Sequence, residues 1–295
     1  MGAVRAISTT DSLAPPAIRK RPGVLKRFSR NPFAVGAFSF LILVILAAIF
    51  APILTPYDPN RIQMGQTLLT PSAEHWLGTD ESGRDEFTRL LYGSRISLTI
   101  GVVAMLLSVT LGTTLGALAG FFGGIIDAIT MRLTDAMLSI PIFFFLLTVL
   151  AVFGSAVPTI IIAIGLSSWM TAARVVRAEV LRTVNLDYVT AARALGAGNW
   201  RVVSVHLLPS AIPSMMVAST IGVGQAILTE SALSYLGVGV QPPEASWGNM
   251  LSNAQNYFFP APMLAIWPGM MILFTVLSFN FIGDSTRDTL SPYQN

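Results

Sequence analysis

The sequence predicts an all-α polytopic membrane protein with about six transmembrane helices. Hydrophobic residues make up 53% of the 295 residues and charged residues only 11%, against about 25% charged in ordinary soluble domains. A helix needs roughly 20 apolar residues to cross a bilayer, and several runs without a charged residue reach that length. These runs are Phe33–Leu54, Ile96–Ile126, Ala136–Met170, Pro209–Thr229 and Leu264–Gly283.

The third run predicts two helices rather than one. It is interrupted by Phe153-Gly154-Ser155-Ala156-Val157-Pro158, where glycine and proline favour a turn. We therefore predict six spans, at 33–55, 95–122, 127–153, 158–180, 210–236 and 264–284.

The basic residues predict the orientation of these spans. Seven Lys and Arg residues precede the first span and five lie in 174–201, whereas 237–263 has none. Basic residues beside spans favour the cytoplasmic side, and placing both termini there puts fourteen of the eighteen in the cytoplasm. The expected organisation is a cytoplasmic basic leader at 1–32, the first span at 33–55, an extracytoplasmic loop at 56–94, a five-helix core at 95–284 and a cytoplasmic tail at 285–295.

Small residues in the second predicted span indicate close helix packing. Gly112, Gly116 and Gly120 recur every four residues and so share one helix face. Such stripes let helices approach each other closely where lipid gives no hydrophobic driving force. We expect this face to pack against another helix of the chain or against a second subunit.

The segment 185–209 is too polar to cross a bilayer. Asn185 is predicted as an N-cap, while Asp187 and Arg193 suit the positive and negative ends of a short helix. Gly196 is expected in the left-handed conformation that ends this helix.

A second short helix is predicted from Gly198 through Val205, with Pro209 as its stop. Small residues of the segment form a surface that another protein's backbone could approach closely, namely Ala191, Ala192, Ala194, Gly196 and Ala197. Taken alone, this pattern fits either a packed intracellular loop or a docking surface.

The spacing of these residues resembles the EAA motif of ABC-importer permeases, E-A-A-x-x-x-G-x(9)-I-x-L-P. Thr190 stands where that family usually has Glu, and His206 where it often has Ile. In the family this segment is the coupling helix, which docks on a cytoplasmic ATPase subunit and carries its closing motion into the membrane. The resemblance implies that the ATPase contact is made by Asp187, Thr190, Ala191, Ala192, Arg193, Gly196, Leu208 and Pro209.

Further blocks narrow the resemblance to one group of these permeases. Residues 78–98 resemble the block before the second span in C-type permease subunits of dipeptide, oligopeptide and nickel importers. Blocks at 123–141, 229–237 and 241–248 resemble the same group in the same order. The resemblance covers residues 30–292 and implies a type I ABC-importer permease fold with a cytoplasmic coupling helix.

The block at 78–95 is predicted to lie outside the membrane. Its acids and arginines fit a solvated loop that folds over the bundle, with a turn shaped by its Asp and Gly residues. The resemblance implies a surface that receives an extracytoplasmic substrate-binding protein, and both descriptions can hold together. The residues expected in that surface are Gly78, Thr79, Asp80, Gly83, Arg84 and Asp85.

Two acidic residues lie within predicted spans. Asp135 is one turn from Arg132, and we expect the two to pair near the cytoplasmic end. Glu230 has no charged residue within a turn, and a lone acid at a helix centre costs about 2.5–3.5 kcal/mol on insertion scales. Glu230 is therefore expected to face the bundle interior or water, either as a protonated, hydrogen-bonded structural acid or as part of the translocation path.

The sequence predicts no catalytic activity for this chain. It has no G-x-x-x-x-G-K-[ST] P-loop, and its only lysines, Lys20 and Lys26, lie in the basic leader. His75 and His206 fall on opposite sides of the membrane in the predicted topology, so no metal site is expected. No cofactor is expected in this chain, and the resemblance places ATP and Mg²⁺ on a partner ATPase.

Together these features predict a permease subunit of an ATP-driven importer in a bacterial plasma membrane. The expected partners are a homologous second permease, cytoplasmic ATPase subunits, an extracytoplasmic substrate-binding protein and the lipid bilayer. The net charge of +3 follows from the excess of basic residues on the cytoplasmic side and requires no nucleic acid.

Di- or oligopeptides are the expected substrate, and nickel, glutathione or another small solute are alternatives within the same family. A self-contained secondary transporter is a less favoured alternative, as is a structural membrane protein. Neither alternative explains the segment 185–209, and no clear repeat relates the two halves of the chain as many secondary transporters would show.

Overall fold

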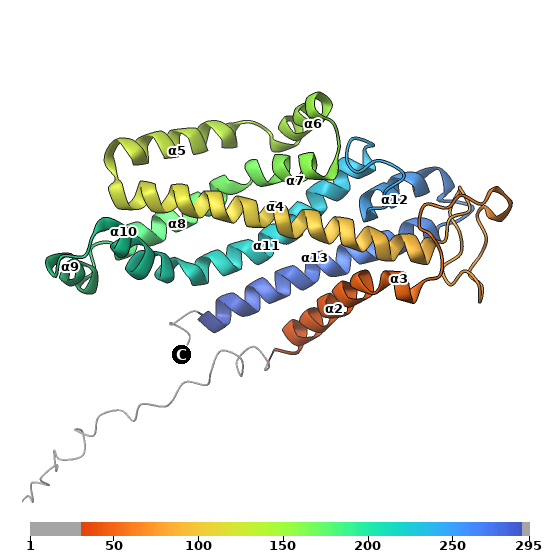
Figure 1. Cartoon of the computed structure of the whole chain (residues 1–295), viewed down its shortest axis with the longest axis horizontal. Coiled ribbons are helices and arrows are strands. Elements are labelled where there is room, and N and C mark those ends of the chain that lie inside the picture. The colour runs from red at the N-terminus through yellow and green to blue at the C-terminus, as the bar shows by residue number, and fades with distance from the viewer. Residues whose placement is uncertain (1–30, 291–295) are drawn as a thin grey trace, which may run out of the picture.

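Helices aligned with one long axis make up most of the described chain (Figure 1). The computed structural model describes residues 31–290, so the predicted basic leader lies almost wholly outside the described residues, as do the last residues of the predicted tail. Within residues 31–290 the regular elements are all helical, and one isolated bridge joins Thr79 to Asp85.

The helices of the described residues follow one another along the chain from α2 to α13. They are α2 (Pro32–Ile49), α3 (Ala51–Leu54), α4 (Glu86–Phe122), α5 (Gly124–Ser139), α6 (Ile142–Phe153), α7 (Val157–Leu166), α8 (Trp169–Thr183), α9 (Asp187–Ala194), α10 (Asn199–Arg201), α11 (Leu208–Tyr235), α12 (Trp247–Ala254) and α13 (Met263–Leu290). Short 3₁₀ helices lie at Met64–Gln66 and Gln255–Tyr257, and a π-helical segment lies at Val202–Leu207.

Long apolar helices account for five of the predicted spans. In the described part of the chain, the helices that are long and apolar enough to cross a membrane are Pro32–Ile49, Glu86–Phe122, Val157–Thr183, Asn199–Tyr235 and Met263–Thr289. Each overlaps a predicted span, so the pattern of charge-free runs located these helices correctly. The predicted break near Gly154 is also confirmed, because α6 ends at Phe153 and Gly154 has a φ of +83°.

The span predicted at 127–153 is not one straight helix. It consists of α5 and α6, which are bent by 86° relative to each other and count as a sixth crossing only if taken as one span. Ile140 between them is extended, with φ −85° and ψ 125°. Pro141 explains the break, because proline disfavours helical geometry in the residue before it and lacks the N–H that a continuing helix needs.

The helix α4 begins at Glu86, earlier than the predicted start at 95. Asp85 is its N-cap, and an oxygen of its side chain accepts a hydrogen bond of 2.8 Å from the backbone N–H of Thr88. This cap satisfies one of the free N–H groups at the helix start. The first turns of α4 therefore replace the end of the loop predicted at 56–94.

The glycine stripe of α4 packs against α8, so of the two predicted partners the structure shows another helix of the chain. A Cβ atom added to Gly116 would lie 2.4 Å from the carbonyl oxygen of Ala173, and one added to Gly112 would lie 2.6 Å from that of Trp169. These separations are far below van der Waals contact, so only glycine allows the two helices to approach this closely.

Candidate functional site

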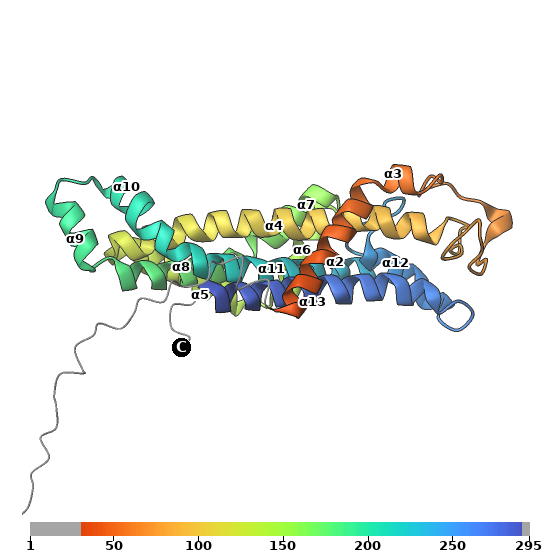
Figure 2. The ribbon, with the colours of Figure 1, turned by 90° about the horizontal axis from the view of Figure 1, so that it is seen from below.

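The predicted coupling residues and the predicted docking residues occupy opposite ends of the molecule (Figure 2). One end carries α9 and α10, which belong to the segment 185–209, called the coupling segment below. The other end carries the connection between α3 and α4 together with α12 (Figure 1). The helices α4 and α11 run between these two ends.

The N-cap of the first helix of the coupling segment lies one residue later than predicted. Its N-cap is Leu186, which makes no side-chain capping bond, so the prediction of Asn185 as N-cap is wrong. Asn185 lies instead in the turn after α8, where the N–H of Leu186 donates to the carbonyl of Thr183 at 3.1 Å. The carbonyl of Leu186 then accepts from the N–H groups of Val189 and Thr190.

Gly196 ends this helix in the predicted way. Its φ is +86°, its N–H donates to the carbonyl of Arg193, and the N–H of Ala197 donates to that of Ala192, both at 3.0 Å. This pair of bonds is the Schellman arrangement that closes many helices with a left-handed residue. No atom lies within 4 Å of a Cβ added to Gly196, so only the backbone conformation requires glycine here.

Pro209 does not stop the second helix, contrary to the prediction. The chain continues from α10 through the π-helical residues 202–207 into α11, and Pro209 occupies the first turn of α11. The N–H of Leu208 donates to the carbonyl of Val203, five residues earlier. The fixed φ of proline suits a helix, and its missing N–H removes one hydrogen bond at the junction between the π-helical segment and α11.

The coupling segment has a buried inner face and an outer face on which two large apolar side chains are exposed among polar ones. Val189, Val202 and Leu207 are fully buried in a cluster with side chains of α8. On the outside, Leu195 is 89% exposed and Trp200 is 69% exposed. Large apolar side chains exposed outside the membrane spans are typical of interaction surfaces, and neither residue was among the predicted coupling residues. Their signal was the presence of large apolar residues on both sides of a glycine turn in an otherwise polar segment.

The remaining predicted coupling residues follow this division. Asp187, Thr190, Ala191, Arg193 and Pro209 are exposed, whereas Ala192 and Leu208 are half-buried. Their contact with an ATPase stays a prediction, because the structure shows their accessibility and not a partner.

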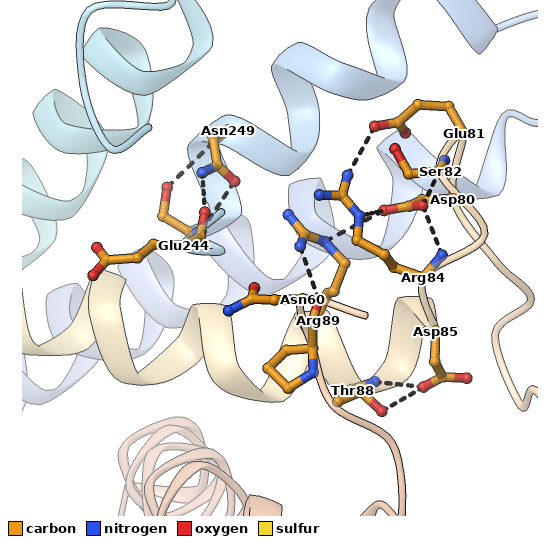
Figure 3. A network of polar contacts seen from close by, with 12 residues as sticks. Asn60, Asp80, Glu81, Ser82, Arg84, Asp85, Thr88, Arg89, Glu244 and Asn249 are labelled. Atoms are coloured by element: carbon orange, nitrogen blue, oxygen red, sulfur yellow. Dashed lines mark hydrogen bonds and ion pairs between the residues drawn. The ribbon is translucent and has the colours of Figure 1, made fainter. Parts of the chain in front are cut away.

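At the opposite end, Asp80 organises a buried ion-pair network (Figure 3). One oxygen of its carboxylate accepts from the backbone N–H groups of Ser82 and Arg84, at 2.8 and 3.0 Å. The other oxygen lies 2.6 Å from Nε of Arg84 and 3.4 Å from Nε of Arg89. Asp80 is only 2% exposed and Arg89 only 1%. The description of this block as a solvated loop is therefore wrong, because its charges are folded into the interior.

Asp85 connects this network to the start of α4 and to the preceding loop. One of its oxygens accepts from the N–H and the hydroxyl of Thr88, and the other lies 2.9 Å from Nδ1 of His75. Gly78 and Gly83 have φ values of +83° and +74°, and a Cβ on either would collide with a backbone carbonyl.

All of the predicted docking residues are buried, namely Gly78, Thr79, Asp80, Gly83, Arg84 and Asp85. Their expected role changes accordingly: they hold the shape of this end of the molecule and do not present side chains on its surface. Docking of a binding protein at this end stays a prediction.

The two acids of the spans have different environments. Asp135 pairs with Arg174 of α8 at 2.5 Å, so the expected pairing with Arg132 is wrong; α5 lies beside α8, and its acid reaches across to that helix. Glu230 is fully buried and accepts hydrogen bonds from the hydroxyls of Ser97 and Ser234. Of the two alternatives for Glu230, the structure shows the hydrogen-bonded interior acid.

A cavity of about 430 Å³ lies between α4, α8, α11 and the α5–α6 pair. Its lining contains no charged residue, and its polar groups are Ser167, Ser168, Thr171, Gln225 and Thr229. Sequence reasoning missed it because neutral side chains from distant segments give no local signal. Within residues 31–290, no group of three or more His, Asp or Glu side chains is placed to hold a metal ion.

Comparison with known proteins identifies two matching family models. The model described as "Binding-protein-dependent transport system inner membrane component" matches residues 112–293, and "N-terminal TM domain of oligopeptide transport permease C" matches residues 23–71.

Relatives with different named substrates are about equally similar to this chain. A glutathione transport system permease protein of Pectobacterium atrosepticum is 40% identical over 90% of this chain and 89% of its own length. A nickel transport system permease protein of Escherichia coli is 39% identical over 87% of this chain and 93% of its own. A di/tripeptide transport system permease protein of Pseudomonas aeruginosa is 40% identical over 90% of this chain and 89% of its own length.

Solved structures share the fold. The MetNI methionine ABC transporter in an inward-facing conformation gives a TM-score of 0.55 at 18% identity, covering 69% of this chain and 97% of that chain. An amino acid ABC transporter gives a TM-score of 0.52 at 18% identity, covering 68% of this chain and 94% of that chain. The predicted all-helical importer-permease fold is thereby confirmed. The chain belongs to the binding-protein-dependent transport system inner membrane components, the permease subunits of ABC importers.

Proposed function

We propose that this permease forms half of the translocation path of a bacterial importer for di- or oligopeptides, and that its coupling segment docks on a cytoplasmic ATPase. Both termini lie in the cytoplasm in this proposal, and the end with α12 faces the outside. The observation that carries it is the outer face of the coupling segment, where the large apolar side chains of Leu195 and Trp200 are exposed. This face stands at the end of the molecule that the basic residues assign to the cytoplasm.

The continuity of the coupling segment with α11 supports mechanical coupling. The chain is helical from Asn199 to Tyr235, so the second half of the coupling segment and the α11 span form a single helical rod. A rod moved at one end also moves at the other, whereas a flexible loop would absorb the displacement. ATP and Mg²⁺ bind to the partner ATPase, whose closure displaces the coupling segment.

The uncharged cavity is proposed as this chain's wall of the path. The hydroxyl and amide groups of Ser168, Thr171, Gln225 and Thr229 can exchange hydrogen bonds with a peptide backbone without imposing a charge preference. A second, homologous permease would close the open side. Relatives named for glutathione and nickel are as similar as those named for peptides, so these solutes are the alternative substrates.

Isolation of the tagged chain from its native membrane in mild detergent, followed by mass spectrometry, tests the assembly. We expect a second permease, an ATPase and a substrate-binding protein to co-purify. Recovery of the chain alone, also after crosslinking, would contradict the proposal.

The substrate is tested with the reconstituted importer. Uptake of a labelled dipeptide, glutathione and nickel is compared in the presence of the co-purified binding protein. We expect ATP-dependent uptake of the dipeptide, and uptake of nickel or glutathione alone would replace peptide as the substrate while leaving the importer assignment intact.

A further inference from the structure

The segment between α11 and α12 folds back against the membrane helices. The backbone N–H of Val240 donates to the hydroxyl oxygen of Ser234 at 2.9 Å. The backbone N–H of Trp247, the first residue of α12, donates to the hydroxyl oxygen of Ser97 on α4 at 3.2 Å, and its indole N–H donates to the carbonyl of Leu90 at 3.3 Å. The residues 236–247, called the return loop below, are thus attached to both α11 and α4.

Both serines pass their hydrogen bonds on to a single carboxyl group. The hydroxyl of Ser234 donates to Oε1 of Glu230 at 2.7 Å, and that of Ser97 donates to Oε2 at 3.1 Å. A serine hydroxyl has one hydrogen and uses its lone pairs to accept. Since each serine accepts a backbone N–H from the return loop or α12, its own hydrogen is available for Glu230. We call each such chain of bonds, from a backbone N–H through a serine hydroxyl to Glu230, a relay. Two relays therefore converge on one fully buried side chain.

Close packing leaves little space between the return loop and α11. A Cβ added to Gly239 would lie 2.4 Å from the backbone nitrogen of Ser234, and one added to Gly248 would lie 2.6 Å from Cα of Ser231. Backbone therefore touches backbone on both sides of the relays. The hydrogen bonds to Glu230 act inside a contact from which the surrounding side chains exclude water.

We propose that Glu230 is a positioning residue that locks the return loop and α12 to α11 and α4. By this lock, a displacement of α11 that starts at the coupling segment reaches the opposite face of the membrane. The direction of transmission rests on the proposed function, whereas the attachment of the return loop through Glu230 does not depend on it. Asn199 and Glu230 belong to the same helical rod, and at 1.5 Å per residue they are roughly 45 Å apart.

The lock depends on Glu230 accepting at both oxygens, as its ionised carboxylate does. The isosteric amide of glutamine offers one acceptor and one donor group. In Glu230→Gln one serine therefore meets a donor in place of an acceptor, and one relay is broken without a change in side-chain volume. Replacing either serine by alanine removes only the relay that passes through that serine.

Hydrogen–deuterium exchange of the purified full-length chain tests the lock without any partner. We expect the amides of Val240 and Trp247 to be protected in the wild type, and at least one of them to exchange about tenfold faster in Glu230→Gln, the effect of about one lost hydrogen bond. The matched control is Glu244→Gln, which makes the same change on an exposed side chain of the return loop. Unchanged exchange in Glu230→Gln would overturn the lock.

Two serine variants distinguish the loss of one relay from faster exchange throughout the return loop. They also test the lock if Glu230→Gln does not fold. Ser234→Ala is expected to expose the amide of Val240 and to leave that of Trp247 protected, and Ser97→Ala is expected to do the reverse. Equal acceleration of both amides in both variants would contradict two separate relays.

ATPase measurements in the assembled importer test transmission. We expect Glu230→Gln to assemble normally and to keep the unstimulated ATPase rate, while stimulation by the loaded binding protein falls about tenfold, as for one lost hydrogen bond. Wild-type stimulation in a variant whose return loop exchanges faster would overturn transmission through Glu230. Failure of the wild-type chain to assemble with an ATPase would instead contradict the proposed function, and the exchange result would stand.

Discussion

The two ends of this permease use similar residue types for different purposes. At the end with α12, Asp80 and Arg89 are buried in an ion-pair network, and a Cβ on Gly83 would lie 2.0 Å from the carbonyl oxygen of Gln63. At the other end, the coupling segment exposes Leu195, and Gly196 has no atom within 4 Å of its Cβ position. Both glycines have positive φ.

This difference teaches how the surroundings of a residue decide its role. Gly83 is needed for both its conformation and its lack of a side chain, so any substitution disturbs the fold. Gly196 is needed only for its conformation, and the space around it is open for a partner. One end is built to keep its shape, and the other presents a surface.

The largest effect is expected from removing the centre of the network. Asp80→Ala leaves Arg84 and Arg89 without their shared carboxylate, and breaking a buried ion pair from one side costs about 3–5 kcal/mol. Thermal unfolding of the purified chain in detergent measures this loss. The control Glu81→Gln removes an acid from the rim of the same network and is expected to change stability far less. Equal unfolding temperatures for the two variants would show that the network does not hold this end together.

The glycine pair gives the next effect. Gly83→Ala is expected to lower the free energy of unfolding by more than Gly196→Ala, because the first combines a strained φ with a steric collision and the second has only the strain, about 1–2 kcal/mol. Chemical denaturation of both variants in detergent measures the difference. The comparison fails if Gly196→Ala is the more damaging change.

A β-branched residue at the open glycine tests function at the same position. Gly196→Val is expected to insert into the membrane and to lose stimulated ATPase activity, because valine strongly disfavours the left-handed conformation that ends α9. Membrane fractionation and ATPase assays of the assembled importer check the two halves of this expectation. Wild-type stimulation of the ATPase by this variant would contradict the assignment of the segment to coupling.

The exposed apolar face is expected to affect binding and not folding. Leu195→Ser should leave stability within about 0.5 kcal/mol. It should weaken ATPase binding by about ten- to a hundredfold, since burying a leucine side chain contributes about 1.5–3 kcal/mol. Titration of the ATPase into the reconstituted permease measures the affinity. Val189→Ser on the inner face is the opposite control, because it should destabilise the chain itself.

The smallest effect is expected from the exposed ion pair between α5 and α8. The side chain of Asp135 is 66% exposed in the isolated chain, and a pair that water reaches contributes about 0–1 kcal/mol. Asp135→Asn should therefore shift the unfolding temperature little and leave transport unchanged. A loss comparable to that of Asp80→Ala would assign Asp135 a role that its exposure does not suggest.

Several features could be predicted from the sequence because they depend on the properties of single residues or short segments. The length of the charge-free runs located the spans, because a bilayer requires about 20 apolar residues whatever their partners are. The turn at Gly154 and the helix end at Gly196 were predictable since a positive φ is a property of a single residue. The family resemblance was visible for the same reason, because it rests on short blocks of residues close together in the chain.

Only the tertiary structure decided the contacts between distant segments. Asp135 pairs with Arg174, and Glu230 meets Ser97, a residue 133 positions away, so no local pattern could name these partners. The burial of 78–85 and the passage of Pro209 into α11 also depended on the surroundings. The physical reason is the same in each case: hydrogen bonds and ion pairs form between side chains that folding brings together, whereas hydrophobicity and backbone preference are carried by each residue alone.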